Sequence, residues 1–404
     1  MAREKKQAAL GFIFVTLLID VIGFGLVIPI FPQLITQLIH SNLSDASRYS
    51  GWLLFAYAII QFIFSPVLGN LSDTYGRRPV LLFSLFGFGL DYILQGFAPN
   101  IYWLFAGRII AGITGGSFTT ASAYIADIST PEKRAQNFGM VGAAFGIGFI
   151  IGPMLGGILG HYGIRVPFFA AAGLALLNWL YGYFVLPESL SHEHRRKFEW
   201  KRANPFGTLT NLKKYPALIG FFASVFLLNI ASHAIQTTWA FYTMIKFKWD
   251  ERIVGYSLGF VGLMIGLVQG VLIRIIIPKI GQKRSIYFGF CMNLTGLILF
   301  AFATKGWMMF AIMIPYSLAA ISGPAIQSII SGHVLPSEQG ELQGALTSLL
   351  SLASIIGPLI MTNTFSYFTS SHTPVYFPGA VMIMGALFSL TGILIAFKVL
   401  QHEP

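Results

Sequence analysis

The feature that most constrains this chain is a series of long apolar stretches separated by short polar loops. An α-helix needs about 20 apolar residues to cross a hydrocarbon core about 30 Å thick. Twelve stretches of this kind are present: 9–38, 50–70, 80–97, 101–127, 136–160, 166–186, 215–245, 253–277, 286–303, 306–331, 340–367 and 375–397. Because they are apolar on every face, a membrane β-barrel is excluded. The sequence therefore predicts an all-α integral membrane protein with twelve transmembrane helices.

The composition excludes an ordinary soluble domain. Of the 404 residues, 55% are hydrophobic and 10% are charged, whereas about a quarter are charged in soluble domains. The net charge of +11 could suit nucleic acid, but Lys and Arg form short clusters between apolar stretches, so we expect no nucleic-acid partner. Cys291 is the sole cysteine, which excludes a disulfide within the chain and a thiolate metal cluster. We expect no metal and no cofactor.

Basic residues concentrate in the loops on one side of the predicted membrane. They are Arg3, Lys5 and Lys6 at the N-terminus, Arg77 and Arg78, Lys133 and Arg134, Lys279, Lys283 and Arg284, and seven residues of the segment 187–214. Cytoplasmic loops of membrane proteins carry such an excess. The pattern predicts a multi-pass plasma-membrane protein with both termini and the central segment in the cytoplasm.

The two halves of the chain repeat each other at a fixed offset of 205 residues. Matching positions are Gly76 and Gly281, Pro131 and Pro336, Gly139 and Gly344, and Gly152-Pro153 and Gly357-Pro358. Gly and Pro that merely recur at the ends of membrane helices would not be separated by one constant offset. The repeat predicts two six-helix bundles, 1–186 and 215–404, related by a pseudo-twofold axis and joined by a linker, 187–214. Such a duplication places a substrate site between the halves near the bilayer midplane.

Three ionisable residues of the first half lie at membrane depth: Asp20, Asp91 and Arg108. An unpaired charge in hydrocarbon costs several kcal/mol, so such residues are either paired or functional. At 1.5 Å per residue, Asp91 and Arg108 lie at similar depths and can pair. Three ionisable groups in one half favour a role in proton coupling or substrate binding, and a structural ion pair is the alternative for any one of them. If Asp91 and Arg108 pair, we predict that Asp20 is the better proton carrier and that loss of Asp91 chiefly lowers stability.

The second half offers mainly uncharged polar groups. Asn229, His233 and Gln236 are at helical spacing, so they share one helix face that could line a solute cavity. Interhelical hydrogen bonding is the alternative for a lone Asn or Gln. The full set of predicted cavity residues is Gln61, Asn229, His233, Gln236, Trp239, Gln269, Asn293 and Gln327.

The loop from Gly69 to Pro79 contains Asp73 and the sequence Gly76-Arg77-Arg78. It resembles the loop signature of the major facilitator superfamily. That resemblance implies a gate, with Asp73 facing the N-terminus of the helix that begins near residue 340, where the helix dipole favours an anion. It also implies an ion pair between Arg77 and Asp127. Arg78 could instead serve only to fix the membrane topology.

The stretch Gly148 to Gly157 contains Gly148, Gly152, Pro153, Gly156 and Gly157. It resembles the fifth-helix motif of proton-coupled drug antiporters within that superfamily, although small residues at this spacing also serve close helix packing. Most of the chain is similar to the tetracycline efflux antiporters, including Leu18-Ile19-Asp20, Leu90-Asp91-Tyr92 and Ala126-Asp127-Ile128. The ninth-helix aspartate and the eighth-helix histidine of that family fall at Asn293 and Ile265.

The resemblance implies a secondary active transporter, a proton-coupled antiporter that exports a small lipophilic or amphiphilic organic compound by alternating access. A drug or tetracycline-like solute, protons and bilayer lipids are its implied partners, a monomer its implied state, and the bacterial inner membrane its implied location. Uptake or facilitated diffusion of a metabolite, or a transporter-like receptor, are the alternatives. The sequence has no catalytic nucleophile motif or nucleotide-binding loop, so we do not expect an enzyme.

Overall fold

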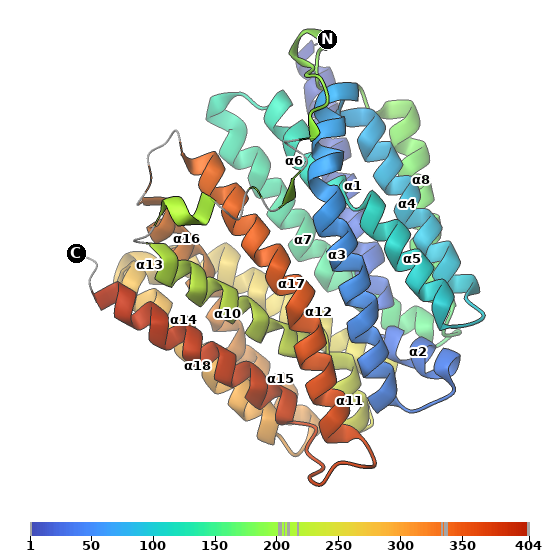
Figure 1. Cartoon of the computed structure of the whole chain (residues 1–404), viewed down its shortest axis with the longest axis vertical. Helices are drawn as coiled ribbons and strands as arrows, with labels where there is room; N and C mark the ends of the chain where they lie inside the picture. The colour runs from blue at the N-terminus through green and yellow to red at the C-terminus, as the bar shows by residue number, and fades with distance from the viewer. Residues whose placement is uncertain are drawn as a thin grey trace. The chain divides into compact units, whose positions relative to one another are not determined.

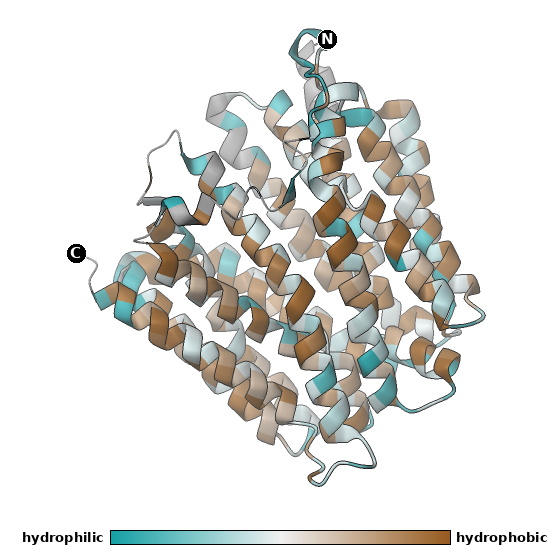
Figure 2. Cartoon of the chain, viewed as in Figure 1, coloured by the Kyte–Doolittle hydropathy of each residue, from teal (hydrophilic) through white to brown (hydrophobic). Residues whose placement is uncertain are grey.

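The computed structural model describes residues 2–200, 204–205, 207, 211–215, 218–332, 334 and 338–401. Every regular element in these ranges is helical, and twelve helical spans among them are long and apolar enough to cross a membrane. Hydrophobic residues occur along the length of the helices, and the loops that join them are mostly hydrophilic, as Figure 2 shows. The predicted all-α membrane fold is therefore confirmed.

The first half of the chain forms eight α-helices, which Figure 1 shows in blue to green. They are α1 (Ala2–Val27), α2 (Phe31–Ile39), α3 (Leu43–Tyr75), α4 (Arg77–Phe97), α5 (Ile101–Thr114), α6 (Ser117–Ile128), α7 (Pro131–Gly160) and α8 (Val166–Val185). In the part of the segment after α8 that the structure describes lie the short 3₁₀ helices η1 (His192–His194) and η3 (Asn211–Lys214). Residues 201–203, 206 and 208–210 of the predicted linker lie outside the described residues.

The second half repeats this pattern with more interruptions. Its elements are α10 (Ile219–Gln236), α11 (Trp239–Phe247), α12 (Glu251–Leu267), the π-turn η5 (Val268–Leu272), α13 (Ile273–Ile280), α14 (Gln282–Phe302), α15 (Gly306–Ser317), the 3₁₀ turn η6 (Leu318–Ile321), α16 (Ser322–Gly332), α17 (Gln339–Thr369) and α18 (Ala380–Gln401).

Several predicted spans are broken in the structure, and most breaks have a local chemical cause. Pro29 lies between α1 and α2, and Gly115-Gly116 separates α5 from α6. Proline lacks a backbone N–H donor, and glycine loses more conformational entropy than other residues when it enters a helix. Both residues therefore weaken a continuous helix. The remaining breaks are Thr237-Thr238 between α10 and α11, the π-turn after α12, and the 3₁₀ turn that follows Pro315.

The offset of 205 residues is also present in the backbone. Gly76 and Gly281 both have positive φ angles, 107° and 81°, and each precedes a helix of 21 residues, α4 and α14. Both α7 and α17 contain an internal proline, Pro153 and Pro358, and continue past it. Pro336, the expected match of Pro131, lies outside the described residues. The two halves thus place matching residues at matching helix positions.

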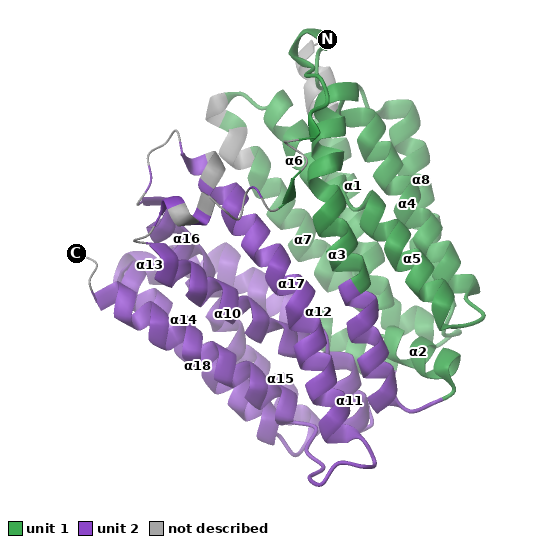
Figure 3. Cartoon of the chain, in the orientation of Figure 1, with its two compact units in different colours: residues 1–40, 56–205, 251–259 green, residues 41–55, 206–250, 260–404 purple. Residues whose placement is uncertain are grey.

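The chain forms two compact units (Figure 3). Unit 1 comprises residues 1–40, 56–205 and 251–259, and unit 2 comprises 41–55, 206–250 and 260–404. Buried side chains of α1, α4 and α6, such as Phe12, Leu81 and Tyr124, form a core in unit 1. A second core in unit 2 includes Phe221 of α10 and Phe290 of α14.

These units differ from the predicted bundles at the first turns of two helices. In unit 2, Ser44 Oγ of α3 donates a hydrogen bond to the carbonyl of Ser366 in α17, at 2.7 Å. In unit 1, the first turns of α12 pack on α7, because Gly157 brings its backbone close to Glu251. Each short segment is therefore grouped with the unit on which it packs. The bundle boundaries drawn from the repeat stay a prediction.

Candidate functional site

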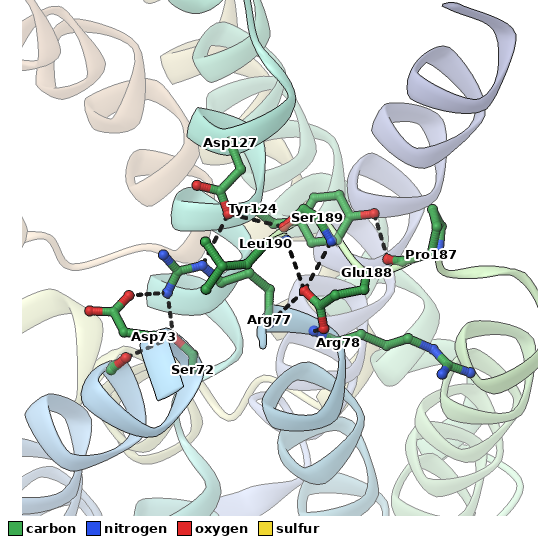
Figure 4. A network of polar contacts seen from close by, with 11 residues as sticks. Ser72, Asp73, Arg77, Arg78, Tyr124, Asp127, Pro187, Glu188, Ser189 and Leu190 are labelled. Carbon is green, nitrogen blue, oxygen red and sulfur yellow. Dashed lines mark hydrogen bonds and ion pairs between the residues drawn. The ribbon is translucent and has the colours of Figure 1, made fainter. Parts of the chain in front are cut away.

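Only Gly76 separates α3 from α4, and the helix ends on either side of it carry a network of charged and polar side chains (Figure 4). The Arg77 guanidinium donates to Asp73 Oδ1 at 2.5 Å, to Asp127 Oδ2 at 3.1 Å and to Ser72 Oγ at 2.7 Å. Charge-assisted bonds of this kind are stronger than neutral ones. The ion pair implied between Arg77 and Asp127 is present, and it ties the start of α4 to the end of α6.

The other loop residues have different surroundings. The Asp73 side chain is 39% exposed. Its implied neighbour, the N-terminus of α17, belongs to unit 2, so that contact stays a prediction. Arg78 donates to the carbonyl of Tyr183 at 2.5 Å and lies over the Tyr183 ring, so it fixes the end of α8. A Cβ atom at Gly69 would meet nothing within 4 Å.

Asp91 of α4 and Arg108 of α5 form an ion pair inside unit 1. Their side chains are 1% and 11% exposed, so the pair is shielded from solvent. Arg108 also lies over the ring of Tyr57, 5.7 Å from its centroid. A Cβ atom at Gly107 would lie 2.5 Å from Asp91 Oδ1. A glycine is therefore required next to Arg108 for the two helices to bring the charges together.

Asp20 of α1 has a different environment. Its Oδ2 atom is buried without a hydrogen-bond partner in the described part of the chain, and Ser117 of α6 lies within hydrogen-bond reach of the carboxyl group. It takes part in none of the ion pairs found among those residues. The structure thus separates a paired carboxylate, Asp91, from a carboxyl group that has no cation beside it.

Sequence reasoning missed two residues of this region. Gln95 is fully buried one helical turn after Asp91, a spacing that places both on one face of α4. Tyr57 accepts a hydrogen bond from Gln61 Nε2, at 2.9 Å, and Gln61 also donates to the carbonyl of Gly115, at 3.1 Å. Gln61, predicted as a cavity residue, therefore links α3 to the end of α5.

The glycines of α7 serve close helix packing within unit 1. A Cβ atom at Gly152 would lie 2.8 Å from the carbonyl oxygen of Ile22 in α1, and one at Gly148 would lie 2.8 Å from the side chain of Val21. Gly156 also lies against the backbone of α1, at Leu26, whereas Gly157 meets the first turn of α12. Pro153 lies inside α7 between these contacts. The motif therefore lets α7 touch a different neighbour on each of two sides.

The cavity candidates of unit 2 divide into two groups. Asn293 and Trp239 pack inside the unit: Asn293 Oδ1 accepts a hydrogen bond from Ser389 at 3.0 Å, and Trp239 lies edge-on to Phe300. Trp239 does not continue the helix face formed by Asn229, His233 and Gln236, because α10 ends at Gln236 and Trp239 begins α11. Gln236, Gln269 in the π-turn and Gln327 in α16 are exposed, and Asn229 is half-buried.

His233 is 7% exposed and packs against Gly357 of α17. Neither ring nitrogen has a hydrogen-bond partner among the residues that the structure describes.

Within those residues, no three His, Cys, Asp or Glu side chains form a group that could hold a metal ion.

The sequence profile of the Major Facilitator Superfamily matches residues 13–358. The chain belongs to this superfamily. It is 39% identical over 386 residues to the tetracycline resistance protein, class C, of Escherichia coli, and 36% identical over 386 residues to the class G protein of Vibrio anguillarum. Each alignment covers 96% of this chain and 96% of the relative.

Solved structures agree on the fold. The human organic anion transporter MFSD10 superposes with a TM-score of 0.70 at 23% identity, over 96% of this chain and 99% of that one. The resemblance to tetracycline efflux proteins is confirmed. The chain is thus a multi-pass membrane transporter of the major facilitator superfamily, a family of transporters and not of enzymes.

Proposed function

We propose that this transporter exports a small lipophilic or amphiphilic organic compound across the bacterial inner membrane in exchange for protons. Tetracycline-like drugs are the first candidates, because the relatives named for tetracycline resistance align over 96% of the chain. The protein works as a monomer, with both termini in the cytoplasm and with the halves 1–186 and 215–404 as the moving bundles. Asn229, His233 and Gln236 contribute to the solute pathway.

The observation that carries the proton-coupling proposal is the contrast between Asp20 and Asp91. Arg108 stabilises the ionised form of Asp91, so this carboxylate binds a proton less readily than a carboxylate buried without a cation. Asp20 has no such partner among the described residues. A buried carboxyl group without a cation costs less free energy when it is protonated, and more when it is ionised. Asp20 is therefore suited to take up a proton in one state and release it in another.

The test uses everted membrane vesicles and tetracycline as the probe. With an imposed proton gradient, wild-type vesicles should accumulate tetracycline, and Asp20→Asn vesicles should not. Tetracycline binding to the purified variant, measured by fluorescence, should stay within about twofold of wild type, because a neutral isostere retains the packing. Accumulation that survives in Asp20→Asn would remove Asp20 as the carrier.

One observation favours a second candidate, transport without proton coupling. Asn293, where the efflux relatives' pattern leads us to expect an aspartate, accepts a hydrogen bond from Ser389 and cannot carry a titrating charge. A facilitator would equilibrate its solute at a rate that does not depend on the gradient. Equal initial rates with and without a proton gradient in proteoliposomes would select this alternative.

A further inference from the structure

The segment that follows α8 crosses the start of α4. The carboxylate of Glu188 accepts hydrogen bonds from the backbone N–H groups of Arg77 and Arg78, at 2.8 and 3.2 Å. It also accepts bonds from the N–H groups of Ser189 and Leu190, at 2.9 and 3.0 Å. Figure 4 shows this carboxylate between the two chain segments. Glu188 therefore acts as the N-terminal cap of α4 from a distant part of the sequence.

The capping position of α4 itself is Gly76, which has no side chain to offer. Its φ of 107° and ψ of 162° fall in a region that only glycine adopts readily. A Cβ atom there would also collide with the Glu188 carboxylate. The first N–H groups of a helix need acceptors, and an anion is favoured there by the helix dipole. Gly76 and Glu188 thus act together. The glycine makes the turn, and the absence of its side chain leaves the space that the Glu188 carboxylate fills.

Residues 187–200, which we call the linker strap, also contact both acidic residues that bind Arg77, one at its carboxylate and the other at its backbone carbonyl. Ser189 Oγ donates to Asp127 Oδ2 at 3.0 Å, and the N–H of Arg196 donates to the carbonyl oxygen of Asp73 at 3.1 Å. Tyr124 of α6 donates to the carbonyl of Pro187 at 2.8 Å. The strap therefore contacts α3, α4 and α6 around the ends of the Arg77 network.

The strap forms one wall of a half-open polar cavity of about 410 Å³ at this end of unit 1. Its walls are Asp73, Arg77, Asp127, Ser189, Leu190, Ser191, His194 and Arg196. The two carboxylates and the two guanidinium groups balance one another, so the cavity favours neither an anion nor a cation. A network of charges in a partly buried site depends on its geometry, because short distances make its interactions strong.

We propose that Glu188 is a positioning residue for transport: by fixing the turn at Gly76 it directs the Arg77 side chain between Asp73 and Asp127. This rests on the proposed transport function and on the gate that the loop signature implies for Asp73, to which Arg77 is paired. A residue that only stabilised the fold would act independently of the Arg77 side chain. A positioning residue loses its effect once that side chain is absent.

The first test needs no substrate. Unfolding of purified protein is measured for Glu188→Ala, Arg77→Gln and the double variant, with Glu193→Ala, an exposed acidic residue of the same strap, as the matched control. We expect the double variant to lose less stability than the sum of the two single losses, and the control to resemble wild type. Additive losses would overturn the coupling between Glu188 and Arg77.

The second test measures transport of tetracycline in proteoliposomes. Glu188→Ala should lower kcat about tenfold, within the usual range for coupled sites, with KM changed less than kcat. In the Arg77→Gln background the same substitution should lower kcat no further. A second tenfold loss in that background, or a wild-type kcat for Glu188→Ala, would overturn the positioning role.

Two further controls distinguish a failure to fold from a loss of positioning, and a wrong substrate from a wrong role for Glu188. Glu188→Gln keeps an oxygen acceptor for three of the four N–H groups, so it should fold and give an intermediate kcat even if Glu188→Ala does not fold. Failure of wild-type protein to transport tetracycline would contradict the proposed substrate. The unfolding cycle would still decide whether Glu188 and Arg77 are coupled.

Discussion

The Asp91–Arg108 pair allows a quantitative prediction for Asp91→Asn. Breaking a buried ion pair by removing one partner costs about 3–5 kcal/mol, because it leaves the other charge uncompensated. The two side chains are 1% and 11% exposed, so solvent can do little to reduce this cost. Asn retains a carbonyl oxygen that can accept one bond from Arg108. We therefore expect the free energy of unfolding to fall by about 3 kcal/mol, the lower end of that range.

The assay is equilibrium unfolding of the purified transporter in mixed micelles, with three variants in parallel. Asp91→Asn and Arg108→Gln should each be destabilised, whereas the double variant should regain about 2 kcal/mol of the summed loss, because neither charge is then stranded. Glu193→Gln, an exposed residue, should stay within about 0.5 kcal/mol of wild type. A loss below 1 kcal/mol for Asp91→Asn, or strictly additive losses, would refute the structural role of the pair.

Two other predictions concern the gate and the helix contacts. Asp73→Asn should lower transport but change stability by less than about 1 kcal/mol, because the Asp73 side chain is 39% exposed in its pair with Arg77; wild-type transport in vesicles would exclude a gating role. Gly152→Ala should cost about 1–3 kcal/mol, since its Cβ would lie 2.8 Å from the carbonyl oxygen of Ile22. A Cβ atom at Gly146 in the same helix would meet nothing within 4 Å, so Gly146→Ala should be neutral or stabilising in the same equilibrium unfolding assay.

The helical spans followed from the sequence because length and hydropathy alone decide what can cross a bilayer. The Asp91–Arg108 pair also followed, since helix geometry fixes depth along the membrane normal. Glu188 could not be found in this way: its four partners are backbone N–H groups, and every residue except proline has one. The break before Trp239 was missed as well, because no glycine or proline marks it.

Comparison of the two halves at matching positions shows where their chemistry has diverged. Because α4 and α14 both contain 21 residues and begin 205 positions apart, Asp91 corresponds to Gly296. Helices α5 and α15 also begin 205 positions apart, so Arg108 corresponds to Met313. In unit 2 these positions are apolar: Gly296 packs against the ring of Tyr316, and Met313 is 2% exposed.

At the positions where the first half has the Asp91–Arg108 ion pair, the second half thus has apolar side-chain packing. A buried pair contributes little net stability compared with apolar packing of similar volume, so stability alone does not explain its presence in the first half. The pair also keeps a fixed positive group, Arg108, in the same unit as Asp20. If Asp20 carries the proton, loss of Asp91 leaves an uncompensated positive charge in the unit that holds Asp20, and an added positive charge favours the ionised form of a carboxyl group. Loss of Asp91 should therefore alter the pH at which transport is half-maximal, an effect that a purely structural pair would not produce.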